Sequence, residues 1–195
     1  TEEAILGPTS GERSLDRRNL RRASALLDEA GWEVGADGIR TKNGERLTAI
    51  VLQVSPAWDR IVNPFVENLL RLGVQAKLER VDPSQYQERR LSADYDLTNH
   101  SFFMGFEPGI GLRQWYDSST AVDSSRNLMG LSDPAIDRLI THVIDAQSLE
   151  EMTTATHALD RALRHTGFWI PQWFKSTHWV AYYDMYRYPE ELPPY

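Results

Sequence analysis

The sequence contains no cysteine among its 195 residues. A disulfide framework, a thiolate zinc site and a cysteine nucleophile are therefore all excluded. It also has no apolar run that approaches the roughly 20 residues a membrane-spanning helix requires, so no transmembrane segment is predicted. The opening TEEAILGPTSGERS lacks an initiator methionine and the basic and then apolar layout of a signal peptide, which predicts a processed or truncated end.

Basic residues are too few for a nucleic-acid surface. The chain has 21 Lys and Arg against 28 Asp and Glu, a net charge of −7, whereas nucleic-acid binding needs a concentrated basic face. One local cluster of arginines occurs in RSLDRRNLRR, residues 13–22. Because Asp16, Asp28 and Glu29 lie on or beside the same helix, we interpret the cluster as a solvated helix face. No nucleic-acid partner is predicted.

Catalytic motifs are absent as well. There is no Gly-rich phosphate loop, no H-E-x-x-H and no G-x-S-x-G. The five histidines include no pair at i and i+4, so neither a metal nor another cofactor is predicted. Asp94 and Asp96 would share one face of a strand, as a paired-carboxylate site requires, but nothing nearby supplies a second acid or a nucleophile. A turn or strand-edge role is favoured for both, and the chain is predicted to be a binding module rather than an enzyme.

The first part of the chain has the pattern of an α/β unit. A helix is predicted over 16–30, because apolar residues recur at helical spacing and Gly31 follows. An Asp-Gly and an Asn-Gly turn then predict a hairpin that leads into a strand over 47–54. Residues 1–15 are expected to be irregular.

A strand, helix, strand unit with parallel strands is predicted over 47–81. Its helix, over 58–72, contains Pro64, which leaves two alternatives. Either Asn63 caps a helix that has Pro64 at its first position, or a longer helix kinks there.

A helix over 83–91 leads to a third strand over 95–103, after which the pattern breaks down. Residues 104–130 hold several glycines and the polar run DSSTAVDSSRN around an isolated apolar pair, Trp115 and Tyr116. We expect a long and mostly irregular excursion. Such loops are uncommon in a compact domain unless they have a function.

Two helices after this excursion are expected to form an antiparallel pair. Ser132 or Asp133 is placed to cap the first, with Pro134 in its first turn. Ser148 and Glu151 fit the capping box of the second, which a glycine ends. Each helix carries an apolar stripe at helical spacing.

Aromatic side chains concentrate in HTGFWIPQWFKSTHWVAYY, residues 165–183. The alternation in FWIPQWF and THWVAYY predicts two short strands. Both faces of these strands are apolar, which favours a place in the core for most of the rings. Pro171 removes a backbone donor and favours an edge strand, so part of the cluster is left to line a cleft.

Four segments occur in the order typical of one protein family: ASALLDEAGW, VENLLRLGVQAKLERVDPSQYQERRLSADYDL, SRNLMGLSDPAIDRLI and ALDRALRHTGFWIPQWFKSTHWVAYYDMYRYPEELPPY. The chain thereby resembles the family-five extracellular solute-binding proteins, the peptide-binding subunits of ABC importers, and its closing segment is most similar to their YejA-like branch. The resemblance implies an α+β fold, a periplasmic-binding-protein lobe of type II with a small mixed sheet, flanking helices and a helical pair. It also implies that the chain is the C-terminal part of a longer, two-lobed receptor.

The same resemblance implies partners and a location. A peptide or peptide-like small solute would lie between the two lobes and pass to the membrane permease of an ABC importer. Residues 16–167 would form the α/β lobe, and residues 168–195 would return as aromatic-rich strands and a tail toward the N-terminal lobe of the same protein. The location would be periplasmic, with the signal peptide absent from this chain.

By position in the family, the segment after ADYDL would run along the cleft. The ligand-binding candidates are His100, Ser101, Phe102, Phe103, Met104, Gly105, Phe106, Glu107, Arg126, Asn127 and Trp173. Relatives hold an aspartate here, in a pattern like Trp-x-x-Asp-Tyr-x-x-Pro, that meets the amino terminus of the peptide. This sequence has Met104 or Gly105 at that point, and Glu107 lies close enough to substitute.

Arg126 has two possible roles, and two further hypotheses concern the function of the whole chain. Arg126 could bind a ligand carboxylate through two parallel hydrogen bonds, or anchor its loop to Asp117 or Asp123. The lobe could instead serve as an interaction or sensor domain, which an exposed apolar patch outside the cleft would favour. A hydrolase accessory domain using Asp94 and Asp96 is the other alternative.

Overall fold

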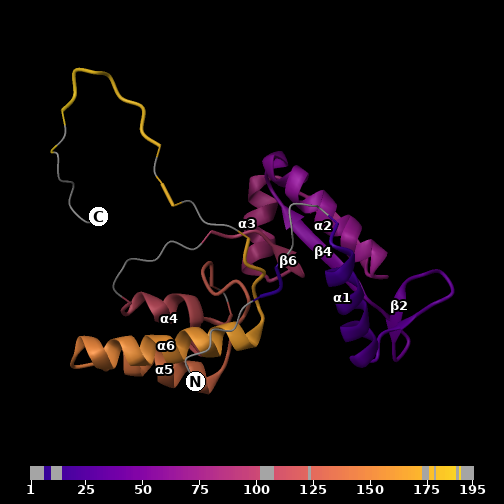
Figure 1. The fold of residues 1–195 in the computed structure, drawn as a ribbon, viewed down its shortest axis with the longest axis horizontal. Coiled ribbons are helices and arrows are strands. Elements are labelled where there is room, and N and C mark those ends of the chain that lie inside the picture. Colours follow the sequence, from indigo (N-terminus) through magenta and orange to yellow (C-terminus); the bar gives the residue numbers. More distant parts are fainter. Residues whose placement is uncertain are drawn as a thin grey trace.

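The computed structural model of the chain describes residues 7–9, 15–101, 108–122, 124–172, 176–177, 179–187 and 189. In chain order the helices and strands are α1 (Arg17–Glu29), β1 (Glu33–Val34), β2 (Arg40–Lys42), β3 (Glu45–Arg46), β4 (Thr48–Gln53), η1 (Pro56–Trp58), α2 (Asp59–Arg71), β5 (Gln75–Arg80), α3 (Pro83–Leu91), β6 (Leu97–Thr98), α4 (Gly111–Tyr116), η2 (Ser118–Thr120), α5 (Pro134–Asp145) and α6 (Leu149–Thr166). Figure 1 shows the α/β elements on one side and α4, α5 and α6 packed together on the other.

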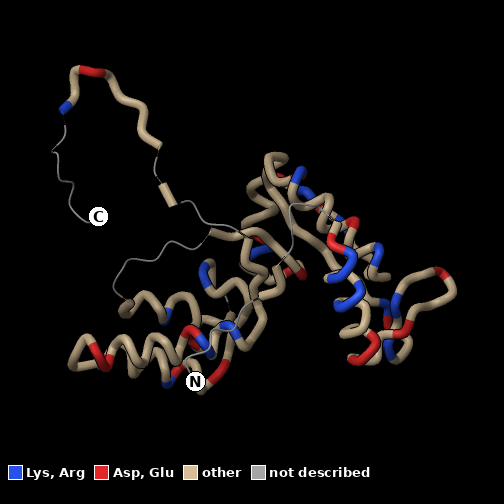
Figure 2. The backbone as a smooth tube through the Cα atoms, in the orientation of Figure 1, with Lys and Arg blue, Asp and Glu red and all other residues tan. Residues whose placement is uncertain are grey.

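The first helix begins and ends where its local signals place it. The Asp16 carboxylate caps α1 by accepting from the backbone N–H groups of Arg18 and Asn19 at 2.9 and 3.0 Å. Gly31 follows the helix with a φ of +83°, which a residue with a side chain rarely adopts. Basic and acidic positions are interspersed over α1 and the strands beside it (Figure 2), as a solvated surface requires.

The predicted hairpin forms, and one buried arginine joins it to the rest of the unit. Strands β1, β2 and β3 make an antiparallel sheet in that order. Arg40 of β2 is only 2% exposed, and its guanidinium donates to the carbonyls of Leu72 and Trp32, to the Asp28 carboxylate and to the Ser24 hydroxyl. It therefore connects α1, the hairpin and the end of α2.

The expected mixed sheet is divided into two sheets. The second sheet has the order β5-β4-β6, and both pairs are parallel, which confirms the predicted strand, helix, strand unit. Helix α2 runs from Asp59 through Pro64 to Arg71, so the longer of the two alternative helices is the one formed. Val62 and Val66 of α2 pack with Ala49, Val51 and further apolar side chains of the sheet. Strand β6 is limited to Leu97–Thr98, much shorter than the predicted 95–103.

The excursion over 104–130 is more regular than expected, because it contains α4 and the 3-10 turn η2. Leu112, Trp115 and Tyr116 share the buried side of α4, at i, i+3 and i+4. They pack into one core with Ile136 and Ile140 of α5 and with apolar residues of α6. The pair Trp115 and Tyr116 is therefore part of a core rather than isolated, and the spacing from Leu112 is the signal that could have shown it.

The helical pair is confirmed with its caps. Asp133 caps α5 by accepting from the N–H of Ala135 at 2.7 Å. The Ser148 hydroxyl caps α6 by accepting from the N–H of Glu151 at 3.1 Å. Gly167 ends α6 with a φ of +66°. None of the described helices has the length and apolar character needed to span a membrane.

Neither of the two predicted strands is formed in the described part of the aromatic segment. Residues 168–172, 176–177 and 179–187 contain no strand in the described structure, and Trp179 is 87% exposed. Phe168 packs against the helical core. Figure 1 shows the described tail running away from the helices, and a strand without a partner strand leaves its backbone donors and acceptors unpaired.

Because of Tyr116, the protein is expected to lose stability at alkaline pH. Burial, together with the charge of Asp160, raises the pKa of Tyr116 to about 12. In the unfolded chain the phenol ionises near pH 10, so between pH 10 and 12 the unfolded state binds fewer protons and the free energy of unfolding falls, by about 2–3 kcal/mol. Urea unfolding from pH 9 to 12 should show this fall, and Tyr116→Phe should reduce it, leaving the part that comes from Tyr95, whose pKa burial also raises.

The matched control is Tyr183→Phe, because Tyr183 is 79% exposed. It should leave the alkaline fall in place. An identical fall in the Tyr116→Phe protein would show that another group causes it.

Candidate functional site

The candidate site lies where the chain leaves the carboxyl end of β6. The His100 ring packs against the indole of Trp115 on α4, with ring centroids 5.3 Å apart and planes tilted by 49°. The Arg126 guanidinium lies over the same indole, 5.2 Å from its centroid. Two of the predicted site residues, far apart in sequence, are thus brought together on one aromatic side chain, in a cation–π and ring-packing arrangement.

A hydrogen-bonded loop holds Arg126 in place. The Ser124 hydroxyl accepts from the N–H groups of Arg126 and Asn127, both at 3.1 Å. The Asn127 side chain is buried, and its amide donates to the carbonyl of Leu131 at 2.9 Å and accepts from the Leu131 N–H at 2.8 Å. Asn127 therefore positions the loop that carries Arg126, with its amide engaged inside the protein.

Asp117 is not the anchor of Arg126. Its carboxylate pairs with Arg113 at 2.8 Å and accepts from the hydroxyl and the N–H of Ser119 at 2.6 and 3.0 Å. The hydrogen bonds from Ser119, followed by the one from Arg113, lower the pKa of Asp117 despite the opposing effect of burial. Asp123, the other anchor considered, lies outside the described residues.

Arg90 also belongs to the site, although it was not among the residues predicted from the sequence. It lies in the last turn of α3, where its Nη2 donates to the carbonyl of Ser125 at 3.2 Å and its guanidinium lies 5.5 Å from the centre of the Tyr86 ring. Nearby, the Tyr95 hydroxyl donates to the carbonyl of Leu128 at 2.6 Å. These contacts attach the α/β side to the loop that holds Arg126.

The site carries positive charge, and its histidine is held neutral. Burial lowers the pKa of His100, and the charges of Arg90 and Arg126 lower it further. Since the charged imidazole is the disfavoured form, His100 remains neutral at pH 7. Among the described residues of the site, the charge therefore comes from the two arginines.

The other site candidates divide into two groups. Ser101 is described and exposed at the end of the segment from β6. The candidates Phe102, Phe103, Met104, Gly105, Phe106, Glu107 and Trp173 lie outside the described residues. Their proposed contact with a ligand stays a prediction.

Asp94 and Asp96 have structural partners. The Asp94 carboxylate pairs with Nε of Arg89 at 2.7 Å, and the Asp96 carboxylate accepts from the N–H of Ile50 at 2.7 Å. These are the turn and strand-edge roles that the sequence favoured. Over the described ranges, no group of His, Asp and Glu side chains is arranged to hold a metal ion.

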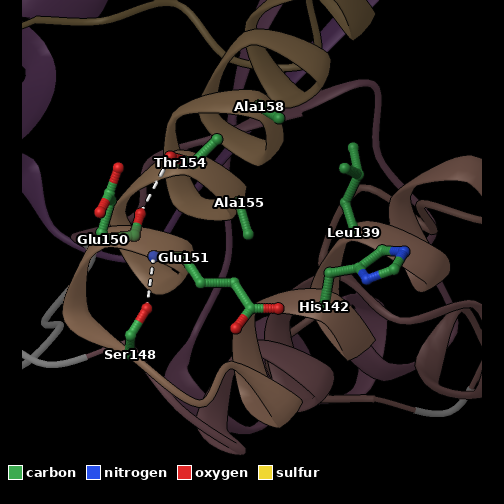
Figure 3. Close-up of a pocket in the computed structure, with 8 residues that line it drawn as sticks. All are labelled: Leu139, His142, Ser148, Glu150, Glu151, Thr154, Ala155 and Ala158. Carbon is green, nitrogen blue, oxygen red and sulfur yellow. Dashed lines mark hydrogen bonds between the residues drawn. The ribbon is translucent and has the colours of Figure 1, made fainter.

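A separate open pocket of about 490 Å³ lies between α5 and α6 (Figure 3). Its lining includes Leu139, His142 and Ala155, with Ser148 and Glu151 at the start of α6. The polar groups at that start are engaged in capping, since the Glu151 carboxylate also accepts from the N–H of Gln147 at 2.9 Å. None of the residues that line this pocket belongs to the arginine and aromatic site.

Comparison with known proteins gives one consistent family. Residues 5–124 match the family described as bacterial extracellular solute-binding proteins, family 5 Middle. The uncharacterized protein y4wM of Sinorhizobium fredii is 37% identical over 190 residues, which cover 96% of this chain and 29% of that protein. The probable peptide-binding protein YejA of Agrobacterium fabrum is 35% identical over 190 residues, covering 96% of this chain and 31% of that protein.

Solved structures agree on the fold. A periplasmic oligopeptide-binding protein of Thermotoga maritima, solved with mannohexaose bound, superposes with a TM-score of 0.69 at 19% identity, covering 80% of this chain and 31% of that one. This likeness confirms the α+β lobe of a periplasmic binding protein. The chain spans about 30% of the length of the curated relatives it matches.

Proposed function

Because this chain belongs to the bacterial extracellular solute-binding proteins of family 5, we propose that it forms one lobe of the substrate-binding component of an ABC importer. The family is one of binding proteins rather than enzymes. The proposed solute is a peptide or a peptide-like molecule, and the proposed location is extracytoplasmic. The Agrobacterium relative is named a probable peptide-binding protein, which supports the choice of solute.

The observation that carries this proposal is the grouping of His100 and Arg126 on Trp115 beside the carboxyl end of β6. Ligands of open parallel sheets bind outside the carboxyl ends of the strands. Small-molecule sites combine apolar and aromatic walls with a few placed polar groups. Trp115 is buried in the helical core and serves here as the support on which His100 and Arg126 are held, and these two residues together with the exposed Ser101 offer the polar groups. An extended peptide could also bond through its main chain, which gives affinity without strong sequence selectivity.

The partners in this proposal are a second lobe and a permease. The second lobe would close over the site, a hinge motion stabilised by ligand contacts made only in the closed form. The closed receptor would then dock on the membrane permease of the importer. The exposed rings of the tail, among them Trp179 at 87% and Tyr183 at 79%, are a surface that the N-terminal lobe of the same protein would cover.

Native mass spectrometry of the full-length receptor, purified without denaturation, tests the proposal. Added masses that correspond to a mixture of short peptides are expected, because main-chain recognition tolerates many sequences. The lengths and end groups of the released peptides would define the solute class.

A receptor that keeps its unliganded mass with panels of peptides and modified peptides would contradict the proposal. The exposed aromatic rings of the tail would then favour the hypothesis that the chain is a protein-interaction domain.

A further inference from the structure

We infer that Arg90 and Arg126 together form an anion subsite, which takes an oxyanion group of the solute, a carboxylate or a phosphate, next to His100. The inference rests on the proposed function, because it names the chemistry of the solute that the same site would hold. Arg126 is a site residue on sequence grounds, whereas Arg90 enters through the structure alone.

The two arginines approach the same place from different elements. Arg90 comes from the last turn of α3 and donates to the carbonyl of Ser125, the residue directly before Arg126. Arg126 reaches over Trp115, against which the His100 ring packs from the other segment. Both guanidinium groups are close enough to His100 for their charges to lower its pKa. The geometry therefore gathers two cations around one imidazole.

In the described structure these two charges lack the carboxylate partner that several other partly buried or paired arginines of the protein have. Arg40 pairs with Asp28, Arg89 with Glu79 and Asp94, and Arg113 with Asp117. Within the described residues, no carboxylate pairs with Arg90 or with Arg126. The Nε–H of Arg90 is buried and has no hydrogen-bond acceptor there.

Two arginines without a carboxylate partner in the described part of a chain of net charge −7 favour an incoming anion. A buried donor without an acceptor costs free energy, and like charges held together repel one another, so an anion placed between them relieves both costs.

Arg126 is also prepared for directional binding. Its planar guanidinium is held over the indole of Trp115, while Ser124 and Asn127 fix its backbone. An arginine held in this way can present two parallel N–H groups to a carboxylate or a phosphate. The neutral His100 adds a hydrogen-bonding group without adding charge. The subsite should therefore discriminate a charged end group from its uncharged amide.

Calorimetric titration of the full-length receptor with three probes tests the inference: trialanine, its C-terminal amide and inorganic phosphate. Trialanine should bind at least about tenfold more tightly than the amide, since hydrogen bonds to charged groups contribute more than neutral ones. Arg126→Gln and Arg90→Gln should each bring the ratio of the two dissociation constants close to one. Arg126→Lys should keep part of the preference, because it retains the charge but loses the fork geometry.

The control variant is Arg138→Gln, an exposed arginine on α5 that should leave the ratio unchanged. Circular dichroism checks that Arg90→Gln folds, and Arg126→Gln alone suffices if it does not, because Arg126 is exposed. Equal binding of trialanine and its amide by the unchanged protein overturns the inference, as does a preference that survives both glutamine variants. Either result leaves the proposed peptide function standing.

Failure of both peptides to bind would count against the peptide function rather than the subsite. The titration with inorganic phosphate then tests the anion subsite without any peptide. If phosphate binds, Arg126→Gln should weaken that binding about tenfold, because a charge-assisted pair is lost. This result would support a subsite for a phosphorylated solute. Absence of phosphate binding as well overturns the inference.

Discussion

Replacing Arg40 with methionine is expected to lower the free energy of unfolding by about 3 kcal/mol. Methionine fills much of the same space but donates no hydrogen bond. The carbonyl of Leu72 would lose a donor at 2.7 Å, and the carbonyl of Trp32, the carboxylate of Asp28 and the hydroxyl of Ser24 would lose theirs. Asp28 is 61% exposed and can turn to water, so most of the loss comes from the carbonyls.

Urea unfolding followed by circular dichroism measures the effect as a lower midpoint with an unchanged slope. Hydrogen exchange should in addition show reduced protection along α1, because Arg40 holds that helix to the end of α2. Arg46→Met is the matched control, since Arg46 pairs with Asp37 while both side chains are about half exposed. It should change the free energy of unfolding by less than about 1 kcal/mol. Equal effects of the two substitutions would contradict the role given to Arg40.

Ile140→Ala is expected to cost about 3–4 kcal/mol, through lost burial and the cavity left behind. Ile140 is fully buried on α5 and belongs to the core that α4, α5 and α6 share. Because helix α4 contributes Trp115 to this core, loosening the core should also disturb the surface on which Arg126 lies.

Urea unfolding gives the stability change, and tryptophan fluorescence of the folded protein reports on the surroundings of Trp115 and of the other tryptophans. Leu149→Ala is the control, because Leu149 is 74% exposed at the start of α6. A loss below 1 kcal/mol for Ile140→Ala would mean that the core between the helices collapses to fill the space.

The features that could be predicted from sequence are those set by neighbouring residues. The caps at Asp16, Asp133 and Ser148 lie within three residues of the N–H groups they satisfy. The predicted bounds of α3, 83–91, match the observed helix because a proline at its first position follows the capping Asp82. Parallel pairing of β4 and β5 also followed from the strand, helix, strand pattern.

The features that could not be predicted depend on distant partners. The strands expected at 168–183 need a partner to complete their hydrogen bonds, and alternation of side chains alone does not provide one. Helix α4 has only six residues, so the spacing of Leu112, Trp115 and Tyr116 is a weak signal by itself, and their burial depends on α5 and α6. The approach of Arg90 to the Arg126 loop joins residues 35 positions apart in the bond to Ser125.

The helical part and the sheet part of the site are expected to form one after the other as the chain folds. Helices α5 and α6 are joined by residues 146–148 alone, so their contacts are local and close rapidly. Strand β4 must instead reach a segment as distant as Asp96, which bonds to Ile50 across 46 positions, and closing so long a loop is slow. The pairing of α5 with α6 can therefore precede the pairing of β6, and the step that brings His100 to Trp115 is the one that completes the site.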